Sequence, residues 1–97
     1  SLMEEYLLSL EELVKNIELA LAEQSPDMLA ESAAHLRTLS ESFQAEDIEQ
    51  LGRRLLDCVD IKLAEPDWKR CDMEFENLTK SFKSYRQLHN SRIKARP

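Results

Sequence analysis

The segment Trp68–Tyr85, WKRCDMEFENLTKSFKSY, carries the clearest pattern in the sequence. Its apolar and aromatic residues recur at alternating spacings of three and four, which is the repeat of one face of an α-helix. They are Trp68, Cys71, Phe75, Leu78, Phe82 and Tyr85. Four of the six aromatic residues of the chain lie on this stripe. We therefore expect the helix to anchor a hydrophobic core.

Two helices with the same periodicity are predicted in the first half of the chain. The first is expected to run from Met3 to about Gln24. Its inner face is formed by Met3, Tyr6, Leu7, Leu10, Leu13, Val14, Ile17, Ala20 and Leu21. Ser25-Pro26-Asp27 then opens the second, because Ser caps free N–H groups, Pro suits the first helical position and Asp favours the positive end of the dipole. The stripe of this second helix is Leu29, Ala33, Leu36, Ser40 and Phe43.

A third helix is predicted from about Ala45 to Leu63, after a break near Gln44. Its stripe is Ile48, Leu51, Leu55 and Cys58, widened by Leu56, Val59 and Leu63. Gly52 inside this run costs about 1 kcal/mol relative to Ala, so it indicates close packing against another helix. Pro66 ends the segment and, with Asp67, opens the helix of the Trp68–Tyr85 stripe.

These four segments predict an all-α fold, an antiparallel up-down-up-down four-helix bundle with short connections. One glycine and three prolines leave little material for β-turns, and 97 residues suit one domain. The predicted domain spans residues 3–91. Residues 92–97 are expected to form a basic tail or the start of a linker, and Ser1 and Leu2 to be a remnant ahead of Met3.

Composition favours a cytoplasmic protein. No apolar run approaches the ~20 residues that span a bilayer, and no secretory signal is visible. Cys58 and Cys71 both fall inside helical patterns, so we expect them to be reduced core residues. The net charge of −6 divides into −10 over residues 1–49 and +4 over residues 50–97. An acidic chain without a concentrated basic face argues against nucleic-acid binding.

The residue patterns of enzymes are missing. A single glycine cannot build a phosphate-binding loop. His35 and His89 stand on different predicted helices, with no cysteine at zinc-like spacing, so no metal or other cofactor is expected. Adjacent carboxylates such as Glu11-Glu12 are surface charges in this pattern. We expect no enzymatic activity.

One further stretch, residues 33–48, AAHLRTLSESFQAEDI, carries a recognisable motif. It resembles the signature of histidine-containing phosphotransfer domains, the four-helix carriers of bacterial and fungal phosphorelays. In that family an exposed His on the second helix is followed, after one intervening residue, by an apolar, a basic and a small residue. Leu36, Arg37 and Thr38 match these positions, and Phe43 matches the bulky residue before the helix break. The similarity covers residues 3–63, and the fourth helix fits as a generic closing helix.

This alignment places Ala34, which cannot carry a phosphoryl group, at the position of the phosphorylated His. His35 falls one residue late, and Gln44 stands where the family commonly has Gly. Taking the core stripe of the second helix as zero, Ala34, Thr38 and Glu41 lie between roughly 120° and 180°, on the solvent face. His35 lies at roughly −120°, outward but on the far flank beside Leu39.

Three interpretations of His35 remain open at this point. It can be an ordinary surface histidine, a phosphoryl acceptor displaced by one residue, or a docking contact. As an acceptor, its neutral imidazole would attack an aspartyl phosphate in the partner, with Arg37 as a cationic neighbour. The partner would supply the Mg²⁺, so the carrier needs only to bring its imidazole within reach of the phosphoryl group.

The resemblance implies a signalling domain that docks a response-regulator receiver domain, either free-standing or beside a histidine kinase in the same chain. The expected docking residues are Ala34, Arg37, Thr38, Glu41, Arg53 and Arg54. Because Ala34 occupies the acceptor position, we favour binding without phosphoryl transfer. A relay through His35 is the alternative. A helical scaffold or oligomerisation module, pairing through the fourth helix, is the alternative of another class.

Overall fold

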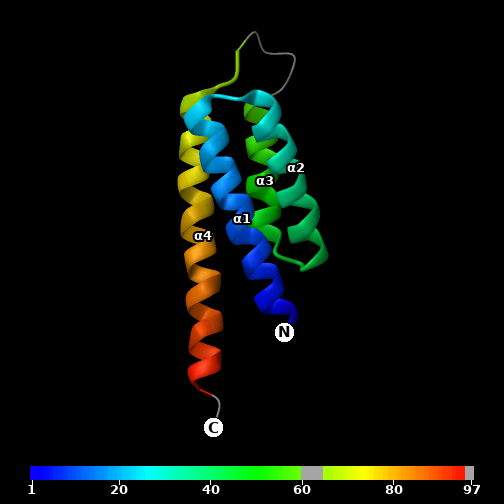
Figure 1. Cartoon of the computed structure of the whole chain (residues 1–97), viewed down its shortest axis with the longest axis vertical. Helices are drawn as coiled ribbons and strands as arrows, with labels where there is room; N and C mark the ends of the chain where they lie inside the picture. Colours follow the sequence, from blue (N-terminus) through cyan, green and yellow to red (C-terminus); the bar gives the residue numbers. More distant parts are fainter. Residues whose placement is uncertain (60–64, 96–97) are drawn as a thin grey trace.

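Four α-helices and their connections make up residues 1–59 and 65–95, the part of the chain that the computed structural model describes (Figure 1). No strand is found among these residues. The helices are α1 (Leu2–Glu23), α2 (Pro26–Ser42), α3 (Glu46–Cys58) and α4 (Trp68–Lys94). The prediction of an all-α fold with four helices is confirmed.

The helix starts follow from side-chain caps at the predicted positions. The Ser25 hydroxyl accepts a hydrogen bond from the Met28 N–H at 3.3 Å, and Pro26 is the first residue of α2. The Asp67 carboxylate accepts from the Arg70 N–H at 3.1 Å, so α4 begins directly after it. Each cap satisfies an N–H that has no partner inside the helix.

Each helix packs against two neighbours, in the cyclic order α1, α2, α3, α4, with the most extensive contact between α2 and α3. Figure 1 shows the α1–α2 connection at the same end of the molecule as the segment that leads into α4. The α2–α3 connection lies toward the other end. At that end α4 extends well past the α2–α3 connection, and the N-terminus of the chain lies at the same end.

The core is built from the predicted stripes. All the apolar residues expected on the inner face of α1 are buried except Met3 and Leu21, which are partly buried. The corresponding buried residues of the other helices are Leu29, Ala33, Leu36, Ile48, Leu51, Leu55, Cys58, Cys71 and Leu78. Between α1 and α2, the Tyr6 hydroxyl lies 2.9 Å from the Ser40 hydroxyl, and the Tyr6 ring stacks on Phe43 with centroids 4.6 Å apart.

The stripe of α4 contributes to this core differently from the prediction. Cys71 and Leu78 are fully buried, whereas the aromatic residues Trp68, Phe75, Phe82 and Tyr85 are only partly buried. Large rings seldom lose all contact with solvent in a small bundle. The aromatic rings therefore cover the edge of the core, and smaller residues fill its centre.

The two cysteines are free and fully buried, Cys58 on α3 and Cys71 on α4, as expected of core residues. Burial raises the pKa of the Cys71 thiol to about 12, which leaves it protonated at neutral pH.

Helix lengths depart from the sequence prediction in two places. Helix α3 ends at Cys58, because Val59 has a non-helical φ of −114° and its N–H donates to the Leu56 carbonyl. The rest of the predicted continuation to Leu63 falls at residues 60–64, outside the described part of the chain. Helix α4 continues to Lys94, into the segment expected to be a tail. Arg92 and Lys94 in its last turn favour this extension, because cations stabilise the negative end of a helix dipole.

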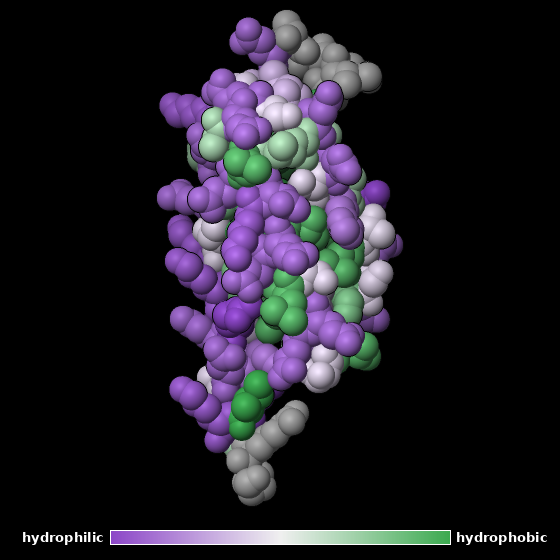
Figure 2. Space-filling view, in the orientation of Figure 1, coloured by the Kyte–Doolittle hydropathy of each residue, from purple (hydrophilic) through white to green (hydrophobic). Residues whose placement is uncertain are grey.

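The face of the molecule shown in Figure 2 is predominantly hydrophilic, interrupted by small hydrophobic patches. Within residues 1–59 and 65–95, no helix is both long and apolar enough to cross a membrane.

Candidate docking surface on α2 and α3

Three of the residues predicted to dock a partner, Ala34, Thr38 and Glu41, lie on the outer side of α2. Thr38 and Glu41 are exposed, and Ala34 is partly buried. The Ser42 hydroxyl donates to the Thr38 carbonyl at 3.2 Å, but no hydrogen bond or ion pair found in the described residues involves the side chain of any of the three. These side chains are free to contact a partner, and that of Ala34 has no group that can accept phosphate.

Close packing between α2 and α3 sets the position of Arg37. A Cβ placed on Gly52 of α3 would lie 3.1 Å from the Ala33 carbonyl oxygen and 3.2 Å from the Arg37 Cβ. Only a glycine fits at this distance without a shift of the α2 backbone. The prediction that Gly52 marks close helix packing is confirmed, and the stem of Arg37 lies on the flank of α2 that meets α3.

Arg53 of α3 shares a shallow hollow with Arg37. The hollow has a volume of about 450 Å³ and is lined by Arg37, Arg53, Leu56 and Asp57. Arg53 also donates from Nε and Nη2 to the Glu49 carboxylate at 3.2 Å and 2.9 Å. Two arginines from different helices therefore line one hollow, beside the acidic Asp57, and each can offer a guanidinium group to an acidic partner.

Arg54 lies toward a different neighbour. Its Nη1 is 3.8 Å from the Glu74 carboxylate of α4. The structure thus brings Arg37 and Arg53 together and directs Arg54 to the opposite flank of α3, although the two arginines of α3 are adjacent in sequence.

His35 is exposed, and none of the hydrogen bonds or ion pairs found in the described residues involves it. Successive residues of a helix turn by about 100°, so His35 is about 200° from Arg37. Since Arg37 lies on the α3 flank, His35 lies on the flank that faces away from α3. The cationic hollow and His35 are on different sides of α2.

The break between α2 and α3 is formed by a residue in the left-handed conformation. Gln44 has a φ of 57°, and the next residue, Ala45, donates its N–H to the Ser40 carbonyl at 2.9 Å. This region favours glycine, because a Cβ crowds the backbone there. The chain therefore adopts at Gln44 a backbone conformation that glycine would enter more readily.

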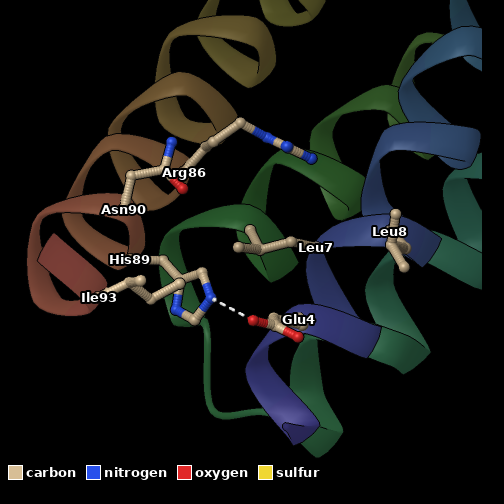
Figure 3. Close-up of a pocket in the computed structure, with 7 residues that line it drawn as sticks. All are labelled: Glu4, Leu7, Leu8, Arg86, His89, Asn90 and Ile93. Atoms are coloured by element: carbon tan, nitrogen blue, oxygen red, sulfur yellow. Dashed lines mark ion pairs between the residues drawn. The ribbon is translucent and has the colours of Figure 1, made fainter.

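Sequence reasoning missed a second hollow, between α1 and α4 (Figure 3). It has a volume of about 300 Å³ and is lined by Glu4, Leu7, Leu8, Arg86, His89, Asn90 and Ile93. The His89 Nε2 points toward Glu4 at 3.6 Å, and it is buried without a hydrogen-bond partner. The signal in the sequence was the presence of Leu8 and Ile93 outside the inner stripes.

Neither hollow offers a metal centre, since no group of three or more His, Cys, Asp or Glu side chains clusters within the described ranges 1–59 and 65–95. What α2 and α3 present is a contact surface: small and polar side chains beside two guanidinium groups. Comparison of the chain with family models, curated proteins and solved structures finds no match.

Proposed function

We propose that this chain is a phosphotransfer-type signalling domain, an up-down-up-down bundle with antiparallel helices, that docks a response-regulator receiver domain without carrying its phosphoryl group. The receiver would bind the outer side of α2 and the adjoining flank of α3. Receivers of this kind act in the cytoplasm, so the proposal implies a cytoplasmic protein. It assigns the domain no catalytic activity.

The observation that carries the proposal is the position of the two guanidinium groups. Arg37 and Arg53 line one hollow on the flank of α2 that meets α3. Ala34, at the acceptor position of the family motif, is about 60° from Arg37 around the helix. His35 is about 200° from Arg37, counted along increasing residue number, and so lies on nearly the opposite side of the helix. A receiver centred on these cations would meet Ala34 and Thr38, with the His35 imidazole outside the contact.

Charge supports the same interface. A receiver holds its phosphoryl aspartate among acidic groups that bind Mg²⁺, so a cationic rim on the partner favours encounter. Glu49 balances part of the charge of Arg53 and Asp57 adds one negative charge to the hollow, but no ion pair among the described residues engages Arg37. Arg37 is therefore the side chain of this surface with the most charge to offer a partner.

The first experiment mixes the protein with phosphorylated receiver domains from its own genome and measures binding and acid-labile phosphate on the bundle. We expect one receiver to bind, with no label on the bundle. Label that disappears in His35→Gln would instead establish a relay through His35. If no receiver binds, the proposal is wrong and the scaffold hypothesis replaces it.

Charge reversal maps the interface once a receiver is found. Arg37→Glu and Arg53→Glu should each weaken binding by about tenfold or more, because a buried or rim cation facing an acidic site is replaced by a repelling charge. Arg54→Glu should have a smaller effect, since Arg54 faces Glu74. Lys15→Glu on α1, an exposed cation far along the sequence from α2, is the matched control and should leave affinity unchanged.

A further inference from the structure

The end of the bundle formed by α1 and α4 has an unusual concentration of exposed apolar side chains. Leu8 of α1 is 62% exposed, and Leu88 and Ile93 of α4 are 50% and 42% exposed. Figure 1 shows that α4 extends past the α2–α3 connection at this end, and Figure 2 shows a hydrophobic patch near the end of α4. Exposed leucine and isoleucine on a polar surface indicate a contact with another molecule.

One face of this end combines the apolar residues with the α1–α4 hollow. Leu8 and Ile93 line the hollow together with Glu4, Arg86 and Asn90 (Figure 3). We name these five residues, with Glu5, the open-end face. By helical geometry Glu4, Glu5 and Glu12 lie within about 60° of Leu8 on α1. Each apolar side chain is thus surrounded by polar and charged groups, which is typical of an interface that also exists in solvent.

The charges on the two helices at this end are opposite and unmixed. Residues 1–14 contain four acids and no base, whereas residues 77–95 contain five bases, Lys or Arg, and no acid. Within one copy only part of this charge is used: Arg86 bonds Glu11 at 3.2 Å and His89 lies 3.6 Å from Glu4. Among the described residues, no ion pair involves Glu5, Glu12 or Lys83.

We infer that the open-end face binds a second copy of this chain. In a two-fold dimer the same patch faces itself, so α1 of one copy lies against α4 of the other. Acidic α1 then meets basic α4 twice, and Leu8 and Ile93 of both copies are removed from water. The two protruding helix pairs together form a second four-helix arrangement. The inference is independent of the proposed receiver docking, because it uses α1 and α4 and leaves α2 free.

Mass in solution tests the dimer directly. Sedimentation or light scattering should show the wild-type mass rising from monomer to dimer between about 1 μM and 1 mM, with the dimer weakened by salt. Leu8→Asp and Ile93→Asp should each raise the dissociation constant by at least about tenfold, since each places a charge in the apolar contact. A monomer at every concentration would overturn the inference and leave the face to a different protein.

Matched variants separate the face from general loss of solubility or folding. Leu19 of α1 and Met73 of α4 are also exposed, 49% and 59%, and neither lines the α1–α4 hollow. Leu19→Asp and Met73→Asp should leave the dissociation constant unchanged. An equal effect of Leu19→Asp and Leu8→Asp would contradict the assignment of the face.

Charge reversal in two separate chains tests the two-fold arrangement. One chain carries Glu5→Lys with Glu12→Lys, and the other carries Lys83→Glu with Arg92→Glu. Each chain alone should stay monomeric, because like charges then face each other. An equal mixture should form a heterodimer, because the basic α1 of the first chain meets the acidic α4 of the second. Failure of the mixture to associate, with wild type dimeric, would overturn the facing of α1 and α4.

Discussion

The α2–α3 contact and the α1–α4 contact join helices of the same bundle by different means. Where α2 meets α3, Gly52 lets the backbones approach so closely that a Cβ would lie 3.1 Å from the Ala33 carbonyl oxygen. Where α1 meets α4 near the chain termini, long side chains make the contact, as in the pair of Arg86 and Glu11, and a hollow of about 300 Å³ remains.

The two contacts should therefore respond differently to substitutions that change side-chain volume or charge. The α2–α3 contact fixes the position of Arg37, so its stability should depend on side-chain volume. The ion pairs at the α1–α4 end are exposed, so this contact should depend only weakly on charge and should tolerate changes in volume. A rigid contact suits a surface that must present side chains at fixed positions. An open end with unpaired charge and exposed apolar groups suits association with another molecule.

The largest effect is expected for Gly52→Leu. The new side chain would collide with the α2 backbone, and overpacking of this kind costs about 2–3 kcal/mol of the free energy of unfolding. Urea denaturation measures the change. Asn90→Ala, at the α1–α4 hollow, is the control and should change stability by no more than about 0.5 kcal/mol. Equal effects of the two would remove the distinction between the contacts.

Tyr85 lies at the boundary between the covered bundle and the open end, and its hydroxyl donates to the Asp47 carboxylate at 2.8 Å. Tyr85→Phe should cost about 1 kcal/mol at neutral pH through loss of this bond. Urea unfolding at pH 7 measures that cost.

The same tyrosine should make stability fall at alkaline pH. Burial first, then the hydrogen bond and charge of Asp47, raise the pKa of Tyr85 from 10.0 to about 12. The unfolded chain therefore loses the phenolic proton first, so the stability that this group contributes is present below pH 10 and lost as the pH rises toward 12. Urea titrations at several pH values should show a weaker alkaline loss in Tyr85→Phe. An identical pH dependence in both proteins would contradict the assignment.

Replacing Gln44 by Gly should stabilise the α2–α3 contact by about 0.5–1 kcal/mol. Glycine relieves the left-handed strain at φ 57°, and its greater freedom in the unfolded chain offsets part of the gain. Gln50→Gly, at an exposed helical position of α3, should instead destabilise the protein by about 1 kcal/mol. Thermal unfolding of both variants measures the contrast, and a loss of stability in Gln44→Gly would refute the strain argument.

The smallest effects are expected for the exposed ion pairs of Glu11, beginning with Arg86→Gln. Its ion pair with Glu11 has both side chains about 40% exposed, so the cost should be about 0.5 kcal/mol and should shrink at high salt. The Lys15 Nζ lies 3.9 Å from the Glu11 carboxylate, and the Lys15 side chain is 73% exposed. Lys15→Gln should therefore cost less still. A loss above about 2 kcal/mol would show that the α1–α4 end is as sensitive as the α2–α3 contact.

The fold was predictable because hydrophobic periodicity and helix caps act locally. Ser25 and Asp67 cap the helices at the positions that their residue types indicate. Gly52 indicated close packing, because a glycine inside a helix has a cost that packing must offset. The end of α4 was less predictable, since Ile93 and Leu88 lie outside the inner stripe and nothing in the local pattern separates a helical end from a tail.

The candidate site was predictable only in part, because its geometry depends on contacts between helices. Arg53 and Arg54 are adjacent in sequence and equivalent in type, yet one shares a hollow with Arg37 and the other faces Glu74. The direction of each side chain depends on the neighbouring helix. The placement of Ala34 at the acceptor position of the family motif stays a prediction that only phosphoryl transfer can test.

The most direct test moves the acceptor. In a chain carrying Ala34→His together with His35→Gln, the only imidazole on α2 stands on the Arg37 flank. Phosphorylated cognate receiver is added, and acid-labile phosphate on the bundle is measured for this variant, for wild type and for His35→Gln alone. Our prediction is label on the double variant and none on the other two. Label on wild type that is lost in His35→Gln, with none on the double variant, would contradict it and assign the acceptor role to His35.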